Sequence, residues 1–213
     1  MSNMSKMTTR FVVASALLVA LAVPSLAQST LWQIDPAHSF AQFSVRHMMI
    51  SNVKGEFSNV TGVVNLDEKD PTRSTVEVSI DTTTVNTHVA KRDAHLRSAD
   101  FFDVEKYPTM TFRSKRIVAV DPGRYKLTGD LTIRGVTREV TFDVEGPTPA
   151  IKDPHGNVRV GAAATAKVNR KDFGLAWNAP LESGGVLVGD DVTITVDVEL
   201  VKKAAPAPAK SGN

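Results

Sequence analysis

Residues 125–145 read YKLTGDLTIRGVTREVTFDVE, and their alternation decides the fold class. Apolar side chains alternate with charged and hydroxyl-bearing ones on both sides of the dipeptide Arg134-Gly135. A period of two is typical of a strand with one buried and one solvated face, and a Gly-containing dipeptide between two such runs is typical of a tight hairpin turn. This stretch therefore predicts an antiparallel β-hairpin.

The same alternation extends outward over most of the chain. Six further runs show it, at residues 39–47, 53–66, 75–81, 109–118, 158–169 and 192–200. With the hairpin they make eight strands, and the short turns between most neighbours favour sequential antiparallel pairing. One short helix, residues 87–99 with Asn86 or Thr87 as its N-cap, is expected between the strands at residues 75–81 and 109–118.

Eight antiparallel strands with one helix fit either a closed barrel or a two-sheet sandwich. Closure removes the exposed strand edges, so we expect an all-β, eight-stranded antiparallel barrel. Several runs are longer than the usual strand of about 5 to 6 residues, which indicates an elongated barrel.

The interior of such a barrel is either filled by its own side chains or hollow enough to hold one ligand. Ala162, Ala164 and Ala166 share one strand face, and Gly129 interrupts the apolar face of another strand. If these faces point inward, the small side chains leave space. The same residues could instead accommodate large neighbours across the barrel, so the pattern alone leaves both interpretations open.

The two ends of the chain differ from the domain between them. Basic residues precede an apolar run at residues 11–23, and the small residues Ser25 and Ala27 follow it. This layout is typical of a secretory signal peptide, and the run is shorter than the roughly 20 residues that a membrane anchor needs. The last twelve residues, 202–213, are rich in Ala, Pro and Lys and have nothing to bury.

We therefore expect three parts: residues 1–27 as a signal peptide, residues 28–203 as the barrel domain, and residues 204–213 as a disordered tail. The mature protein would be periplasmic or secreted, with no membrane span after cleavage. A role for the tail as a tether is the alternative on composition. Without residues 1–27 the chain has 23 basic and 23 acidic side chains, which does not resemble the charge footprint of a nucleic-acid-binding protein.

The reactive side chains form no local catalytic or metal-binding pattern. The chain has no Cys, which excludes thiol nucleophiles, thiolate metal sites and disulfides. His38 and His47 would face opposite sides of one regular strand. His88 and His95 would share a helical face but lie about 10.5 Å apart along the axis. We expect no enzyme activity, no metal site and no required cofactor, although a site assembled from distant segments stays an alternative.

Five groups of motifs carry a family likeness that runs in order from Trp32 to about Val201. They are DPAHS at 35–39, SVRH to GEF at 44–57, LRSADFFD with YPT at 96–109, GDLTIRGVT at 129–137, and NRKDFG, WN and GGVLVGD at 169–190. Together they resemble the YceI-like, polyisoprenoid-binding family. The resemblance implies a lipocalin-like barrel that holds a polyisoprenoid, such as an isoprenoid quinone or a related long-chain amphiphile, for transport, storage or sequestration.

Two other functions stay open at this point. The protein could be an enzyme acting on a bound lipid or quinone, or a filled barrel that serves as a stress-related interaction protein. The sequence is also compatible with a homodimer.

The candidate binding residues divide into an apolar lining and a polar group. The expected apolar lining is Phe43, Val45, Phe57, Phe112, Leu127, Leu131, Phe142, Ala164 and Trp177. A lipid head group would need a few donors among apolar walls, and the candidates are His38, Arg46 and His47.

We predict that the mature protein begins at Gln28, because Ser25 and Ala27 supply the small residues that a signal peptidase requires. N-terminal sequencing of the exported protein checks this. Exported material that still contains residues 11–23 would contradict the cleavage site.

Overall fold

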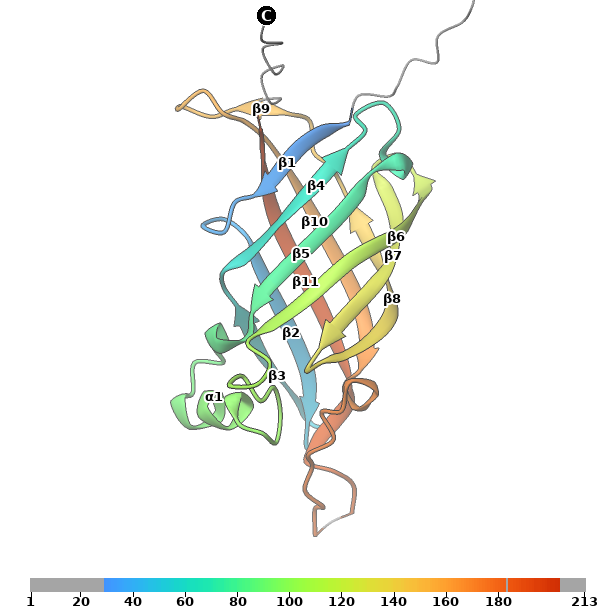
Figure 1. The fold of residues 1–213 in the computed structure, drawn as a ribbon. Helices are drawn as coiled ribbons and strands as arrows, with labels where there is room; N and C mark the ends of the chain where they lie inside the picture. Colours follow the sequence, from blue (N-terminus) through green and yellow to red (C-terminus); the bar gives the residue numbers. More distant parts are fainter. Residues whose placement is uncertain (1–28, 183, 204–213) are drawn as a thin grey trace, which may run out of the picture.

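The computed structural model describes residues 29–182 and 184–203, where eleven strands form one antiparallel sheet (Figure 1). The strands are β1 (Thr30–Ile34), β2 (Phe40–His47), β3 (Ser51–Phe57), β4 (Val60–Leu66), β5 (Thr75–Asp81), β6 (Thr109–Asp121), β7 (Arg124–Ile133), β8 (Val136–Glu145), β9 (Ile151–Lys152), β10 (Val158–Asn169) and β11 (Val188–Lys202). The helices are α1 (Ala90–Arg97) and three short 3-10 helices, η1 (Pro71–Arg73), η2 (Thr82–Thr84) and η3 (Arg170–Phe173). The expected signal peptide and tail lie outside the described residues.

Pairing between β10 and β11 closes the sheet into a barrel. The closed ring runs β11-β1-β4-β5-β6-β7-β8-β10 and back to β11, which makes eight strands. The closing pair extends from Arg159 opposite Val201 to Asn169 opposite Asp191. The expectation of a closed eight-stranded antiparallel barrel with one helix is therefore confirmed.

The membership of the ring differs from the expected set of strands. β1 was not predicted, and it pairs with β4 on one side and with the end of β11 on the other. Residues 53–66 form two strands, β3 and β4, because Asn59 between them has a left-handed backbone with φ of 57°. β2 pairs with β11 and β3 pairs with β2, so these two strands form a hairpin outside the closed ring.

The helix is shorter than expected and starts differently. With β1 counted and residues 53–66 divided, α1 lies between β5 and β6. Its N-cap is Val89 and has no side-chain hydrogen bond, so the prediction of Asn86 or Thr87 as the cap is wrong. A capping side chain accepts from the helix backbone, whereas Thr87 donates its N–H and its hydroxyl to the buried carboxylate of Asp93, at 2.8 and 2.5 Å.

The described part of the chain contains no helix with the length and apolar character needed to cross a membrane.

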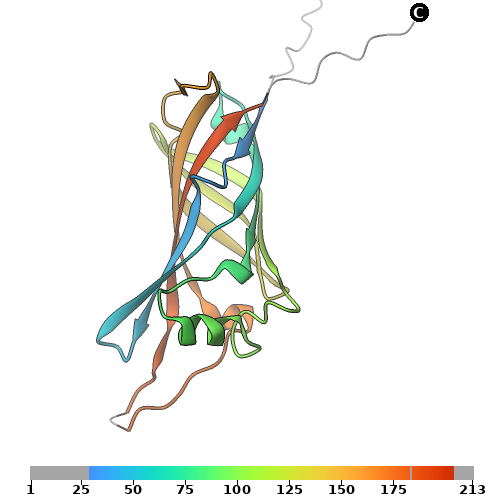
Figure 2. The same cartoon turned by 90° about the vertical axis from the view of Figure 1, so that its left-hand side faces the viewer.

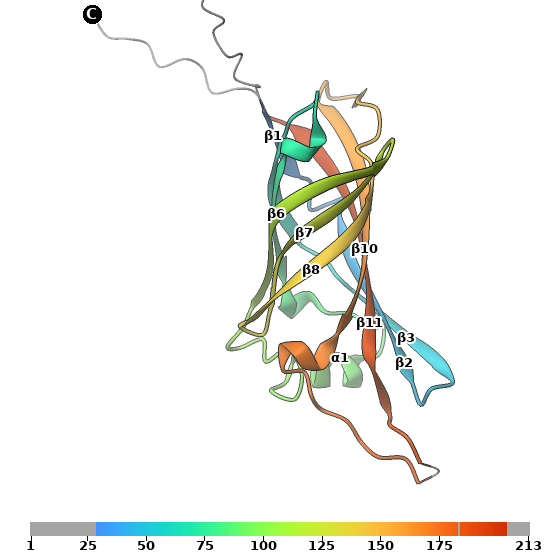
Figure 3. The same ribbon diagram turned by 90° about the vertical axis from the view of Figure 1, so that its right-hand side faces the viewer.

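The two ends of the barrel carry different elements (Figures 1, 2 and 3). We call the end with α1, η3 and the β2–β3 turn the α1 end, and the opposite end, with β9 and η1, the β9 end. Arg134 and Gly135 form the expected tight turn between β7 and β8, both with positive φ. The Arg134 guanidinium also donates to the carbonyls of Ala99 and Gly174, at 2.7 and 2.8 Å. This turn therefore ties the segment after α1 to the segment after η3.

Arg159 joins three segments that are distant in sequence. Its guanidinium donates to Asp35 Oδ2 at 2.6 Å, to Asp153 Oδ2 at 2.8 Å and to Glu199 Oε2 at 3.0 Å. These acids belong to the β1–β2 loop, the β9–β10 loop and β11. The hydrogen bond from Arg159, helped by one from His38, lowers the pKa of Asp35 from 3.8 to about 2.

We predict that Arg159→Gln lowers the free energy of unfolding at neutral pH, because it leaves three carboxylates without their shared partner. The folded state holds the pKa of Asp35 at about 2, below the ordinary value of 3.8. The Asp35 contribution is therefore complete above about pH 5 and is lost as the pH falls toward about 2. Urea unfolding between pH 7 and pH 2.5 checks this.

The difference in stability between wild type and variant should stay constant above about pH 5 and narrow below about pH 4. Arg113→Gln is the matched control, because Arg113 makes an exposed ion pair with Glu77. A constant difference down to pH 2.5 would contradict the role given to Asp35.

Candidate functional site

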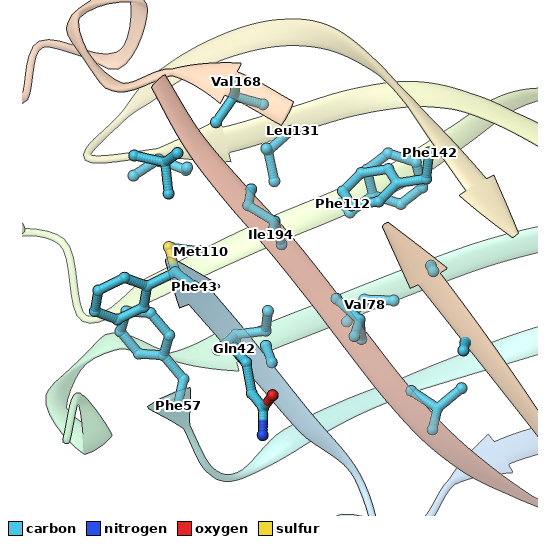
Figure 4. A pocket seen from close by; sticks show the side chains of 18 of the residues that line it. Gln42, Phe43, Phe57, Val78, Met110, Phe112, Leu131, Phe142, Val168 and Ile194 are labelled. Carbon is cyan, nitrogen blue, oxygen red and sulfur yellow. The ribbon is translucent and has the colours of Figure 1, made fainter. Parts of the chain in front are cut away.

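The barrel encloses an elongated cavity of about 440 Å³. All strands of the closed ring except β1 contribute at least two side chains to its walls, and β2, β3, α1 and η3 add to them. All nine residues of the expected apolar lining border this cavity: Phe43, Val45, Phe57, Phe112, Leu127, Leu131, Phe142, Ala164 and Trp177. Figure 4 shows several of these side chains around the same space. Their contact with a ligand stays a prediction.

Alanines of β10 keep part of the interior open. Ala162 and Ala164 line the cavity, opposite Val198 and Val196 of β11. The methyl groups of Ala162 and Ala164 leave room that a larger side chain at these positions would occupy. At these two positions the structure fits the interpretation that small side chains leave space inside a hollow barrel.

Gly129 in β7 has a different role. A Cβ atom at this position would lie 2.6 Å from the Phe112 ring and 2.3 Å from the carbonyl oxygen of Arg113. The glycine therefore accommodates a large neighbour and leaves no space of its own. The Phe112 ring packs edge-on against Phe142, with centroids 5.3 Å apart.

Aromatic rings gather at the α1 end of the cavity. Phe57 packs against Phe43 and, edge-on, against Phe102, with centroids 5.8 and 5.3 Å away. Trp177 packs 5.3 Å from Phe101 and 4.7 Å from the His95 ring. These contacts hold α1, the segment after it and the loop after η3 against the barrel.

The titratable side chains that line the cavity are all Arg, His or Tyr. They are Arg46, His47, Arg92, His95, Tyr125 and Arg170, and none of the described lining residues is Asp or Glu. All but Tyr125 come from β2, α1 and η3 at the α1 end. The cavity is therefore apolar along its length and cationic at one end.

These polar groups are held by hydrogen bonds outside the apolar space. Arg92 donates to the Thr87 hydroxyl at 2.7 Å and to the Thr87 carbonyl at 2.9 Å. His95 Nε2 lies 2.9 Å from Asp100 Oδ2, so the carboxylate orients the imidazole. Arg92 and His95 were not among the predicted head-group residues, because no local sequence pattern shows where their helix docks.

Arg170 anchors the loop between η3 and β11. Only 5% of Arg170 is exposed, and it donates to the carbonyls of Leu175, Trp177 and Gly189, the last two at 2.9 and 2.8 Å. Burial lowers the pKa of the guanidinium, and Asp190 at 3.3 Å opposes that change. Because its donors are taken by the protein, we assign Arg170 a structural role in holding the loop.

The three expected head-group residues lie in different places. Arg46 and His47 border the cavity at the α1 end. His38 does not line it, because its Nδ1 atom pairs with Asp35 Oδ2 at 2.9 Å in an exposed turn. The expected common helical face of His88 and His95 is also wrong, since His88 precedes α1 with φ of 61°.

Asp35, His38 and Glu199 are the one group of described residues whose ligand atoms lie close enough to share a metal ion. Arg159 Nη1 already lies 2.6 and 3.0 Å from the two carboxylates. The two carboxylates of this group are therefore already paired with a cation of the protein itself.

Comparisons with known proteins agree with this architecture. The sequence profile of the YceI-like domain matches residues 32–200. A UPF0312 protein of Staphylococcus aureus (strain N315) is 35% identical over 170 residues, which are 80% of this chain and 96% of the relative. A UPF0312 protein of Vibrio parahaemolyticus is 38% identical over 164 residues, which are 76% and 86% of the two chains.

Solved structures show the same fold. The YCEI protein of Campylobacter jejuni is 33% identical and superposes with a TM-score of 0.63, over 75% of this chain and 90% of that one. A polyisoprenoid binding domain from Saccharophagus degradans is 14% identical and superposes with a TM-score of 0.56, over 82% and 99% of the two chains.

We predict that Gly129→Ala destabilises the barrel by about 1–3 kcal/mol, because the added methyl group meets a backbone carbonyl and a packed ring. Ala164→Val adds volume toward open space and should cost less than about 1 kcal/mol. Urea unfolding of both variants compares the two positions. Equal destabilisation would show that the interior at Ala164 is as full as at Gly129.

Proposed function

Because the chain belongs to the YceI-like family, we propose that its barrel binds one long-chain lipid in the central cavity, with a polyisoprenoid such as an isoprenoid quinone as the ligand. One observation carries the proposal: the cavity is elongated and apolar, and its cationic side chains are confined to one end. That distribution of groups matches a ligand with an apolar tail and a small polar head.

The tail is the main source of affinity. Removing apolar surface from water contributes roughly 25 cal/mol per Å², so a long hydrocarbon chain enclosed by the barrel gains several kcal/mol. The volume of about 440 Å³ lies within the usual range of small-molecule sites. It also argues against a filled barrel.

The head group would lie at the α1 end. Arg46, Arg92 and His95 there can donate hydrogen bonds, and the described lining offers no carboxylate that would repel an electron-rich head. A quinone carries two carbonyl oxygens, which accept hydrogen bonds only. Donors without a competing carboxylate therefore favour such a head over an ammonium-bearing one.

We place this activity in the periplasm or outside the cell, on the strength of the residues 1–27 pattern. A polyisoprenoid is insoluble in water, so a protein that encloses it can carry, store or sequester it in an aqueous compartment. The proposal needs no cofactor besides the ligand and no catalytic step. The Saccharophagus degradans domain of the same fold is named for polyisoprenoid binding, which supports this ligand class.

Native mass spectrometry of freshly purified protein, followed by lipid extraction, tests the proposal. One long-chain lipid per barrel, released on unfolding, is the expected result. Protein that is free of lipid, and that takes up none when incubated with an isoprenoid quinone in detergent, would refute it.

We predict that Ala164→Trp lowers the lipid recovered per mole of protein at least tenfold, because the indole occupies space that the tail needs. An indole in the cavity prevents part of the apolar tail from being buried. We expect this to remove at least about 1.4 kcal/mol of the binding free energy, which corresponds to a tenfold loss of affinity. The control is Thr165→Trp, at the neighbouring exposed position of the same strand. Lipid content and melting temperature of the apo-protein are measured for both variants.

A variant at Ala164 that melts far lower yet keeps its full lipid load would contradict the cavity as the binding site. An equal loss of lipid in both variants would contradict it as well.

A further inference from the structure

The turn between β2 and β3 presents three consecutive apolar side chains to solvent. Met48, Met49 and Ile50 are 40%, 54% and 77% exposed, and Ile50 is the most exposed large hydrophobic side chain in the described chain. Figures 2 and 3 show this hairpin projecting beyond the wall of the barrel at the α1 end. Three adjacent large apolar side chains in water need an explanation, unlike single ones scattered over a surface.

The turn itself does not require apolar residues. Met48 and Met49 have φ of 50° and 61°, a left-handed conformation in which Asn is favoured over larger side chains. Hydrogen bonds hold this backbone in place: Met48 N donates to Leu187 O at 2.8 Å, and Arg46 donates to Met49 O at 2.7 Å. The fold therefore fixes the turn and leaves the three side chains free to contact something else.

The hairpin segment around the turn carries charge of one sign, and the two acidic residues of the adjacent part of β11, Asp190 and Asp191, are paired with Lys171 and Lys167. Residues 42–55 contain Arg46, His47 and Lys54 and no acidic residue. An apolar tip with cations behind it is the pattern that binds at the surface of an anionic bilayer, where apolar groups enter the interface and cations meet phosphates.

The tip also adjoins the cavity. Arg46 and His47 on one side of the turn line the cavity, as does Leu187, whose carbonyl accepts from the Met48 backbone. A surface bound to the tip would thus face the cationic end of the cavity.

We propose that the Met48–Ile50 tip docks the protein on an anionic phospholipid bilayer, with the α1 end of the barrel toward the membrane. A second copy of the chain fits less well, because three side chains cannot supply the roughly 800 Å² per partner of a stable protein interface. The inference of docking depends only on the exposed tip and its charge. Its use for exchanging lipid between bilayer and cavity rests on the proposed function.

The test compares wild type with the combined variant Met48→Asn, Met49→Asn and Ile50→Asn. Asn suits the left-handed backbone of the first two positions, so the fold should be retained, which the melting temperature checks. The matched control is Ile151→Asn in β9, at the opposite end, where Ile151 is 64% exposed. Flotation with vesicles of phosphatidylglycerol and phosphatidylethanolamine measures binding, and phosphatidylcholine vesicles serve as the uncharged surface.

Wild type and Ile151→Asn should float with the anionic vesicles, and the tip variant should bind at least tenfold more weakly. Binding of wild type should fall on phosphatidylcholine and at high salt. The tip variant should also take up a quinone from vesicles more slowly while keeping the wild-type lipid load in detergent. Equal flotation of wild type and tip variant, or an equal loss in Ile151→Asn, would overturn the proposal.

Two further outcomes separate this inference from the proposed function. Vesicle binding without any recoverable lipid would support docking and refute the carrier. Recoverable lipid without vesicle binding would refute the docking and leave the proposed lipid binding supported. A concentration-dependent dimer that the tip variant abolishes, seen by analytical ultracentrifugation, would overturn bilayer docking in favour of a second copy.

Discussion

The pairing of β10 with β11 is the constraint on which the rest of the structure depends. β11 uses one edge for β10 and the other edge for two strands in succession, β2 along residues 188–197 and β1 along residues 200–202. Because side chains alternate between the two faces of a strand, this register decides which set of residues faces the interior. A shift by one residue would turn Ala162 and Ala164 outward and bring Thr165 and Lys167 into the apolar space.

Two kinds of small residue act differently inside the closed ring. Gly129 lets the Phe112 ring pack over the backbone of β7, whereas Ala162 and Ala164 border empty volume. Large rings fill parts of the barrel, and the alanine face of β10 keeps another part open. The hollow interior thus depends on the small side chains of β10 and does not follow from strand number alone, since an eight-stranded ring can equally be filled.

Sequence patterns predicted a closed barrel of eight antiparallel strands, but not which strands form the ring, because alternation with a period of two is a local property of each strand. All nine residues of the expected apolar lining border the cavity. β1 was missed because it is only five residues long, and the division of residues 53–66 depends on the backbone of Asn59. The cationic end of the cavity was found only in part. Arg92 and His95 reach it through the docking of α1, and no local pattern shows where a helix docks. The ion pairs of Arg159 were also not predicted, because its partners lie up to 124 residues away in sequence.

The β2–β3 hairpin lies at a free end of the strand order, attached to the ring through β11. The bore of a closed barrel is fixed by the number and stagger of the strands within the ring, and this hairpin contributes to neither. The turn at residues 48–50 can therefore change without altering the bore of the ring, whereas changes within β2 and β3 would alter the cavity wall, because Phe43, Arg46 and Phe57 line it. The tip of the hairpin and the bore of the ring are thus set by different parts of the chain, and the two strands that carry the tip connect them, because their side chains form part of the cavity wall.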